Sequence, residues 1–280
     1  MITKTIIKVK VILLSIAVLL LTSSCSYNTL NLKSREKIET LSMKVLQKAA
    51  SDISLSAEKI EKYLYDISLD QTVQESLKTL SNDEDEFQKM YASRQITNIL
   101  TEKLFEESQI AYAGVVNDSG YSMEYRLSMD VFSDKESMRE HIKAVKDKKG
   151  SILWLPVIAD DANYILAAKS IRHISSGKEL GTFLILLKES YFADIYKSIG
   201  YGENSSIFIM DSAGVVISTT DEGLKTAKEY AGKKITDKIF NSQSQDKQGM
   251  FTIDINQIEK LVAFYYIPSM DWYIVGIISK

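Results

Sequence analysis

The sequence predicts an α+β protein in which one long N-terminal helix precedes two tandem units, each an antiparallel sheet flanked by helices. Three observations support this prediction. Apolar residues recur every three or four positions over residues 32–67, a range without proline or glycine. From residue 108 onward, short strand-like runs separated by polar turns replace this helical pattern. The order of these runs then repeats after about ninety residues, which indicates duplication of one unit.

The N-terminus has the order of a secretory signal peptide. Lys4, Lys8 and Lys10 precede an apolar run over residues 11–21, and small residues 22–24 follow it. A bilayer core needs about 20 apolar residues in a helix, so this run is short for a membrane span. We therefore expect a signal peptide over residues 1–24. The alternative is an uncleaved anchor over residues 6–21, with its lysines reaching back to the interface.

Cys25 is the only cysteine of the chain and directly follows the small residues. An odd cysteine in an exported protein cannot belong to an internal disulfide framework. Its position resembles the lipobox of bacterial lipoproteins, which implies lipidation of Cys25 and a short tether over residues 25–30. The family usually places leucine three positions before the cysteine, whereas this chain has Thr22 there and Leu21 one position earlier. An ordinary signal peptide followed by a chance cysteine is the alternative.

Composition excludes several classes of function. The formal net charge of −3 argues against a nucleic-acid partner, because phosphate binding depends on a basic surface. The two histidines, His141 and His173, are far apart in sequence, so we expect no metal site and no cofactor. No nucleophile motif or phosphate-binding glycine loop is present, and the sequence therefore predicts a protein that is not an enzyme, with no catalytic residues.

The helical part is predicted over residues 31–107, as a stalk and a second helix that packs on the first unit. In the stalk, apolar residues that we call the stalk stripe lie on one face of the helix. A second helical tract, residues 73–105, is interrupted by the acidic residues 81–86, which are typical of a helix start. The stalk stripe consists of Ile38, Leu41, Val45, Ala49, Ile53, Ile60, Leu64 and Ile67.

The two predicted units cover residues 108–189 and 203–280, joined by a linking helix over residues 190–202. Residues 115–120 match residues 209–214, and in both segments apolar residues lead into a turn that ends in glycine. Later strands match as well, residues 164–171 with 261–267 and residues 182–187 with 272–278. Within the units we expect helices at 133–145, 191–199 and 235–240, and further strands at 111–116, 152–158, 206–210 and 250–255.

A long N-terminal helix followed by two such units resembles the double Cache domain, a pair of PAS-like units in the extracytoplasmic part of bacterial chemoreceptors and sensor histidine kinases. The resemblance rests on residues 206–218, with the letters IFIMDSAGVVIS, and on MDWYIVGII near the C-terminus. It covers residues 31–280 and implies two tandem PAS-like units, the first of them distal to the membrane. Such receptors continue into a second membrane helix, whereas this chain ends at Lys280, so we expect a membrane partner such as a sensor kinase, transporter or receptor.

The resemblance also implies a small-molecule ligand in the first unit. Amino-acid-binding members carry an Arg-x-Trp-Tyr run, but residues 130–135 here read DVFSDK, which argues against a standard α-amino acid. Asp160 and Asp161 fall where the family places its amine-binding aspartate, which favours an amine-bearing ligand. Aromatic rings with a few polar groups suit such a pocket. The candidate ligand-binding residues are Tyr121, Tyr125, Arg126, Trp154, Asp160, Asp161 and Tyr164.

Each candidate also has a structural interpretation. Trp154 lies in an apolar strand and could belong to the core, and the three tyrosines could be half-buried strand residues. Arg126 could pair with local carboxylates. Trp272, which begins the last strand, is expected to pack the core of the second unit.

The sequence thus predicts a small-molecule-sensing lipoprotein on the extracytoplasmic face of the cell membrane, acting through a membrane partner. A homodimer through the stalk stripe, which includes Ile53 and Ile60, is one expectation, and packing of that stripe inside one monomer is the alternative. Two other functions stay open. One is a structural or interaction lipoprotein without a ligand, and the other is the truncated sensor half of a receptor.

Overall fold

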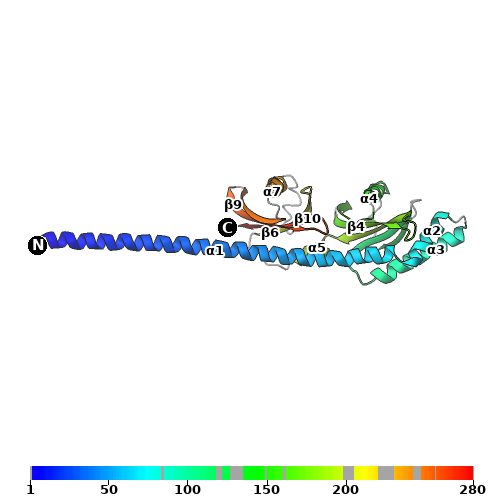
Figure 1. Ribbon diagram of the computed structural model, residues 1–280, viewed down its shortest axis with the longest axis horizontal. Coiled ribbons are helices and arrows are strands. Elements are labelled where there is room, and N and C mark those ends of the chain that lie inside the picture. Colours follow the sequence, from blue (N-terminus) through cyan, green and yellow to red (C-terminus); the bar gives the residue numbers. More distant parts are fainter. Residues whose placement is uncertain are drawn as a thin grey trace. The chain divides into compact units, whose positions relative to one another are not determined.

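The structure is a computed structural model that describes residues 2–82, 85–117, 122–126, 135–148, 150–159, 162–197, 205–219, 230–241, 247–255 and 257–279 (Figure 1). At residues 2–32 it describes the backbone alone. The described part contains six helices and ten strands. The chain divides into two compact units, Met1–Val45 and Leu46–Lys280.

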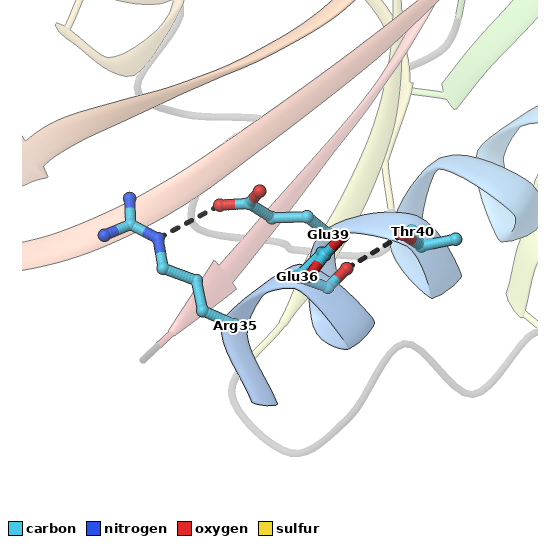
Figure 2. A network of polar contacts seen from close by, with 4 residues as sticks. All are labelled: Arg35, Glu36, Glu39 and Thr40. Carbon is cyan, nitrogen blue, oxygen red and sulfur yellow. Dashed lines mark hydrogen bonds and ion pairs between the residues drawn. The ribbon is translucent and has the colours of Figure 1, made fainter. Parts of the chain in front are cut away.

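Helix α1, Ile2–Ser68, forms the whole described part of the first unit and continues into the second. Local side-chain contacts support the helix near the end of the first unit (Figure 2). Arg35 Nε lies 3.0 Å from Glu39 Oε1, and Thr40 Oγ1 donates to Glu36 O at 2.8 Å. A side-chain pair at i,i+4 such as Arg35 and Glu39 stabilises a helix by roughly 0.2–0.5 kcal/mol. The bond of Thr40 satisfies its hydroxyl but adds no such stabilisation, because it goes to a backbone carbonyl. No helix within the described residues has an apolar stretch long enough to span a membrane.

The stalk stripe is buried in the second unit from Ala49 onward, whereas its first members, Ile38 and Leu41, are exposed. Ile53, Ile60 and Leu64 are completely buried, as the spacing of three and four residues predicted. The expected long helix is confirmed. Because Ile53 and Ile60 pack inside the monomer, as the alternative predicted, two chains cannot pair through these two residues. A homodimer through another part of the stalk stays a prediction.

Helices α2, Gln71–Asn82, and α3, Glu86–Leu104, follow α1. Asp70 begins α2, since its carboxylate accepts the backbone N–H groups of Thr72 at 2.9 Å and Val73 at 3.2 Å. Asp85 is the N-cap of α3 and accepts from Phe87 N at 2.9 Å. The acidic segment therefore starts a helix, as predicted from the sequence.

Two five-stranded antiparallel sheets follow, with orders β2-β1-β5-β4-β3 and β7-β6-β10-β9-β8. Both sheets have the same connectivity, which confirms that one unit is duplicated. The first sheet, named the distal sheet after its predicted position, comprises β1 Ile110–Asn117, β2 Ser122–Arg126, β3 Leu153–Ala159, β4 Ala162–Arg172 and β5 Glu179–Lys188. The second, the proximal sheet, comprises β6 Ser206–Asp211, β7 Val216–Thr219, β8 Gln248–Ile255, β9 Ile258–Ile267 and β10 Trp272–Ser279.

One helix covers a face of each sheet (Figure 1). Helix α4, Lys135–Asp147, packs on the distal sheet through Val145, and α7, Tyr230–Asn241, packs on the proximal sheet through Ile235 and Ile239. The opposite face of the distal sheet meets α1, since Lys169 Nζ lies 4.4 Å from the centre of the Tyr65 ring. Helix α5, Ser190–Lys197, links the two sheets.

The turn between β6 and β7 shows why the second copy of the matched segment ends in glycine. Gly214 has a φ of 84°, a conformation that a side chain disfavours. Asp211 Oδ1 accepts the N–H groups of Ala213 at 3.0 Å and Val215 at 2.8 Å, which closes the turn. The tight turn predicted at residues 211–214 is thus present.

Burial on α1 leads to a test of how the helix is held. We expect Ile60→Ala to lower the free energy of unfolding by roughly 2–5 kcal/mol, because it leaves a cavity against the sheet. Leu55→Ala, on the exposed face of the same helix, should change it by less than about 0.5 kcal/mol. Urea unfolding followed by circular dichroism measures both. Equal losses would show that the two faces of α1 are equally buried.

Candidate ligand site

The two sheets meet at a cluster of three aromatic rings from different elements. Trp154 of β3, Phe192 of α5 and Trp272 of β10 each lie 6.0 Å, ring centre to ring centre, from the other two. All three pairs have edge-to-face geometry, which aromatic rings favour. Trp154 Nε1 also donates to Glu61 Oε1 at 3.2 Å, which ties the cluster to α1. Trp272 is buried as expected, but it packs between the sheets and not in the core beneath α7.

A buried polar network lies beside this cluster. Glu189, the residue between β5 and α5, accepts from Ser218 Oγ at 2.6 Å and from Thr219 N at 3.2 Å. The Tyr196 hydroxyl of α5 bonds to the Ser218 hydroxyl. Burial raises the pKa of Tyr196, the bond to Ser218 partly offsets this, and the carboxylates of Glu189 and Asp194 raise the pKa further. The Tyr196 hydroxyl is therefore neutral at physiological pH, and the network fastens β7 to the linking helix.

A cavity of about 220 Å³ lies between the β3–β4 hairpin and β7. Strands β3 and β7 are edge strands of their sheets, so each leaves one row of backbone groups outside the sheet pairing. The wall is largely apolar, and four of its residues have polar side chains. The lining residues are Pro156, Val157, Ile158, Asn163, Tyr164, Val215, Val216, Ile217, Ser218 and Thr219.

Two polar side chains of this wall are available to a ligand. The side-chain amide of Asn163 and the Tyr164 hydroxyl have no hydrogen-bond partner among the described residues. The backbone carbonyl of Asn163 accepts from Glu189 N at 3.2 Å. Ser218, in contrast, is already engaged by Glu189. An apolar wall with two free hydrogen-bonding groups suits a small molecule that has an apolar body and polar substituents.

The residues predicted for the site fall into separate places. Tyr164 lines the cavity and pairs with Val157 across the hairpin, so these two side chains share one face of the sheet. Side chains alternate along a strand, so Trp154, three residues before Val157, lies on the other face, where it contacts α1. Tyr125 lies on β2, three strands from β4 or about 14 Å. The backbone of Arg126 ends β2, and its side chain is outside the described residues. Tyr121, Asp160, Asp161 and the Cys25 side chain are also outside them.

Sequence reasoning missed the contribution of the second unit to this cavity. Asn163 and Ser218 are far apart in the chain, and no motif connects them. Their meeting depends on how α5 orients the proximal sheet, which a single sequence does not reveal. Tyr164 was found because it is an aromatic residue close to a turn that carries two carboxylates.

A second polar area lies on the face of the distal sheet beneath α4. Ser170 and Thr182 are opposite each other on β4 and β5, both buried, and neither hydroxyl has a hydrogen-bond partner within the described residues. Nearby, the Tyr112 hydroxyl lies 3.3 Å from Glu124 Oε1, and the ring covers Gly114. Buried hydroxyls on an apolar face are costly unless they find a partner. Groups of three potential metal-binding side chains are absent from the part of the chain that the structure describes.

Comparison with known proteins identifies the architecture. A family model described as Cache domain matches residues 29–280. The ligand-binding domain of Mlp24 with asparagine has a TM-score of 0.61 and 17% identity, covering 88% of this chain and 95% of that chain. No curated protein matches the chain in sequence.

Two further solved structures share the fold. The ligand-binding domain of the Pseudomonas aeruginosa PAO1 amino-acid chemoreceptor PctC in complex with GABA has a TM-score of 0.59 at 15% identity, covering 84% of this chain and 97% of that chain. The sensory domain of the Campylobacter jejuni chemoreceptor Tlp3 with isoleucine bound has a TM-score of 0.61 at 15% identity, covering 90% and 94%.

The network around Glu189 gives a second prediction. Ser218→Ala should lower the free energy of unfolding by about 1–3 kcal/mol, because it removes one partner from a buried carboxylate and from the buried Tyr196 hydroxyl. Ser212→Ala removes an exposed hydrogen bond to Asp271 and serves as the matched control, with an expected change below about 0.5 kcal/mol. Urea denaturation of each variant measures the difference. A neutral Ser218→Ala would mean that the network does not hold β7.

Proposed function

Because the chain belongs to the Cache domain family, we propose that it is an extracytoplasmic module that binds a small molecule and acts through a membrane partner. The observation that carries this proposal is the cavity between the β3–β4 hairpin and β7. Its wall combines apolar surface with the polar groups of Asn163 and Tyr164, which have no hydrogen-bond partner in the part of the chain that the structure describes. The function assigned is binding, not catalysis.

The position of the cavity supports a sensing role. One wall belongs to the distal sheet and the other to β7 of the proximal sheet, so a bound molecule would contact both. A ligand can shift a conformational equilibrium only by its difference in affinity for the two states. If the two sheets move relative to each other, the walls of this site change their spacing, so the affinity for the ligand differs between the two states.

The ligand class that we propose is an amine with an apolar body. Asp160 and Asp161 lie in sequence between the lining residues Ile158 and Asn163. A carboxylate near a cavity favours a cationic group through a charge-assisted hydrogen bond. The three solved structures described above are named with asparagine, GABA or isoleucine, each of which carries an amine. A free α-carboxylate is not required here, since the Arg-x-Trp-Tyr run is absent.

The binding proposal predicts selective effects of single substitutions. A thermal-shift screen of the protein against amines, amino acids, organic acids and sugars should give at least one amine that raises the melting temperature. For that amine, Tyr164→Phe and Asn163→Ala should each weaken binding by about five- to tenfold in calorimetric titration, because each removes one hydrogen bond. Tyr91→Phe, an exposed tyrosine of α3, is the matched control and should bind as the unchanged protein does.

Two results would contradict this assignment. Absence of a shift with every compound would favour a structural lipoprotein without a ligand. If neither cavity variant weakens binding, the amine binds outside this cavity. The hydroxyls of Ser170 and Thr182 beneath α4 would then be the next site to test.

Attachment to the membrane is the second part of the proposal. We propose that the thiol of Cys25 receives a diacylglycerol group after export and that residues 25–30 tether the domain. Each buried methylene of an acyl chain contributes about 0.8 kcal/mol, so two or more chains hold a protein firmly on a membrane. A sensor kinase, transporter or receptor in the same membrane would then receive the signal.

Substitution of the cysteine tests the anchor. Cys25→Ser should release the protein from the membrane fraction into the medium or leave it with an unprocessed N-terminus, because no thiol is available for acylation. Ser23→Ala keeps a small residue before the cysteine and should stay membrane-bound. Mass spectrometry of the mature N-terminus gives the direct measurement. An intact Met1 in the unchanged protein would instead indicate an uncleaved anchor over residues 6–21.

A further inference from the structure

A second cavity lies at the opposite end of the distal sheet from the first. It has a volume of about 340 Å³ and is formed between the C-terminal end of α2 and the turn that joins β4 to β5. Polar side chains dominate its wall, in contrast to the first cavity. The lining residues are Lys78, Ser81, Asn82, His173, Ser176, Lys178, Glu179 and Leu180.

One buried side chain holds the two walls of this cavity together. Gln74 of α2 is almost completely buried, and its amide nitrogen donates to Arg172 O at 2.9 Å and to Ser68 O at 2.8 Å. Its amide oxygen accepts from Ile174 N at 3.3 Å. All hydrogen-bonding groups of this amide thus fasten the β4–β5 turn to α2 and α1, so the spacing of the walls is set before any ligand arrives.

The β4–β5 turn is also closed internally. His173 N donates to Lys178 O and Gly177 N donates to His173 O, both at 2.8 Å. Ser176 N donates to His173 Nδ1 at 3.2 Å, so in the neutral ring the proton resides on Nε2, which leaves that nitrogen as a donor. Gly177 has a φ of 68°, which such a tight connection requires.

The charge balance of the cavity is positive. Lys78 and Lys178 form no ion pair among the described residues, and both line the cavity. The one carboxylate of the wall, Glu179, is already paired with Lys146 at 3.0 Å. Of the described acidic residues that follow α2, Asp85 caps α3 and Glu86 lies 3.0 Å from Lys89. Within the described residues, the ammonium groups of Lys78 and Lys178 therefore have no counter-charge at this cavity.

We infer that this cavity is a binding site for a small dianion, such as inorganic phosphate or a short dicarboxylate. Two ammonium groups match two negative charges, and His173 Nε2 can donate a hydrogen bond to an oxygen atom. The hydroxyls of Ser81 and Ser176 already donate within the protein, to Leu77 O at 3.0 Å and to His173 Nδ1 at 2.8 Å. The inference does not depend on the amine site, because the two cavities share no lining residue.

Calorimetric titration of the whole protein tests this site with two probes, sodium phosphate and succinate, at constant ionic strength. At least one of them should bind with one-to-one stoichiometry. Lys78→Gln and Lys178→Gln should each weaken that binding by about five- to tenfold, and the double variant should abolish it, because each lysine supplies one charged hydrogen bond. Lys62→Gln removes an exposed lysine of α1 outside the cavity and should leave the affinity unchanged.

The two probes separate the chemical sources of the dianion. Binding of phosphate alone indicates an oxyanion ligand, binding of succinate alone indicates a dicarboxylate, and both outcomes support the site. Binding of neither probe overturns the inference, and so does binding that Lys62→Gln weakens as much as Lys78→Gln, since this would reflect general surface charge. Amine binding by the Tyr164→Phe variant is measured in a separate experiment. A negative result for the dianion therefore leaves the amine site open to confirmation, and a negative result for the amine leaves the dianion site open.

Discussion

Trp154, Phe192 and Trp272 come from three different elements, and their mutual contact fixes where the two sheets meet. The other described links between the sheets are α5, a helix of eight residues, and the hydrogen bonds that join Glu189 and Tyr196 to β7. Edge-to-face contacts of this kind add about 0.5–1.5 kcal/mol per pair beyond the area they bury.

The polar network next to the rings holds β7 on α5 and also reaches the first cavity. Ser218 lines the first cavity and simultaneously donates to Glu189, which directly precedes α5. A molecule in the cavity therefore touches the same strand that the linking helix holds. Movement of β7 would have to stretch the bonds to Glu189 and Tyr196, and buried polar groups that lose partners are expensive.

The fold was largely predictable from the sequence, and the reasons are local. The spacing of Ile53, Ile60 and Leu64 predicts a buried helical face, and Asp211 with Gly214 predicts a tight turn in the second copy of the unit. Strand register was not predictable, and it decides the site. Trp154 and Tyr164 are on the same hairpin, yet their pairing partners place them on opposite faces of the sheet. A shift of one residue would exchange the two faces.

The site could be predicted only in part because its walls are non-local. Tyr164 stands out by residue type, whereas Ser218 and Val216 are ordinary strand residues that gain a role only through the packing of the second sheet. The same argument applies to Lys78 and Lys178, which a sequence shows as two unrelated surface charges. Gln74 joins the two walls of the cavity that these lysines line. In the sequence, a buried glutamine within a helix cannot be distinguished from an exposed one.

Strand β4 connects the two cavities physically. Asn163 and Tyr164 lie at its beginning, and His173 follows its last residue. Between them β4 is paired along its length with β5 on one side and with β3 over its first seven residues on the other, and close-packed structure has low compressibility and transmits strain. An amine at one end would act on the junction with the proximal sheet, and a dianion at the other would act on the joint between α2 and the β4–β5 turn. Any coupling between the two would have to be reciprocal, since each ligand would change the affinity for the other by the same factor.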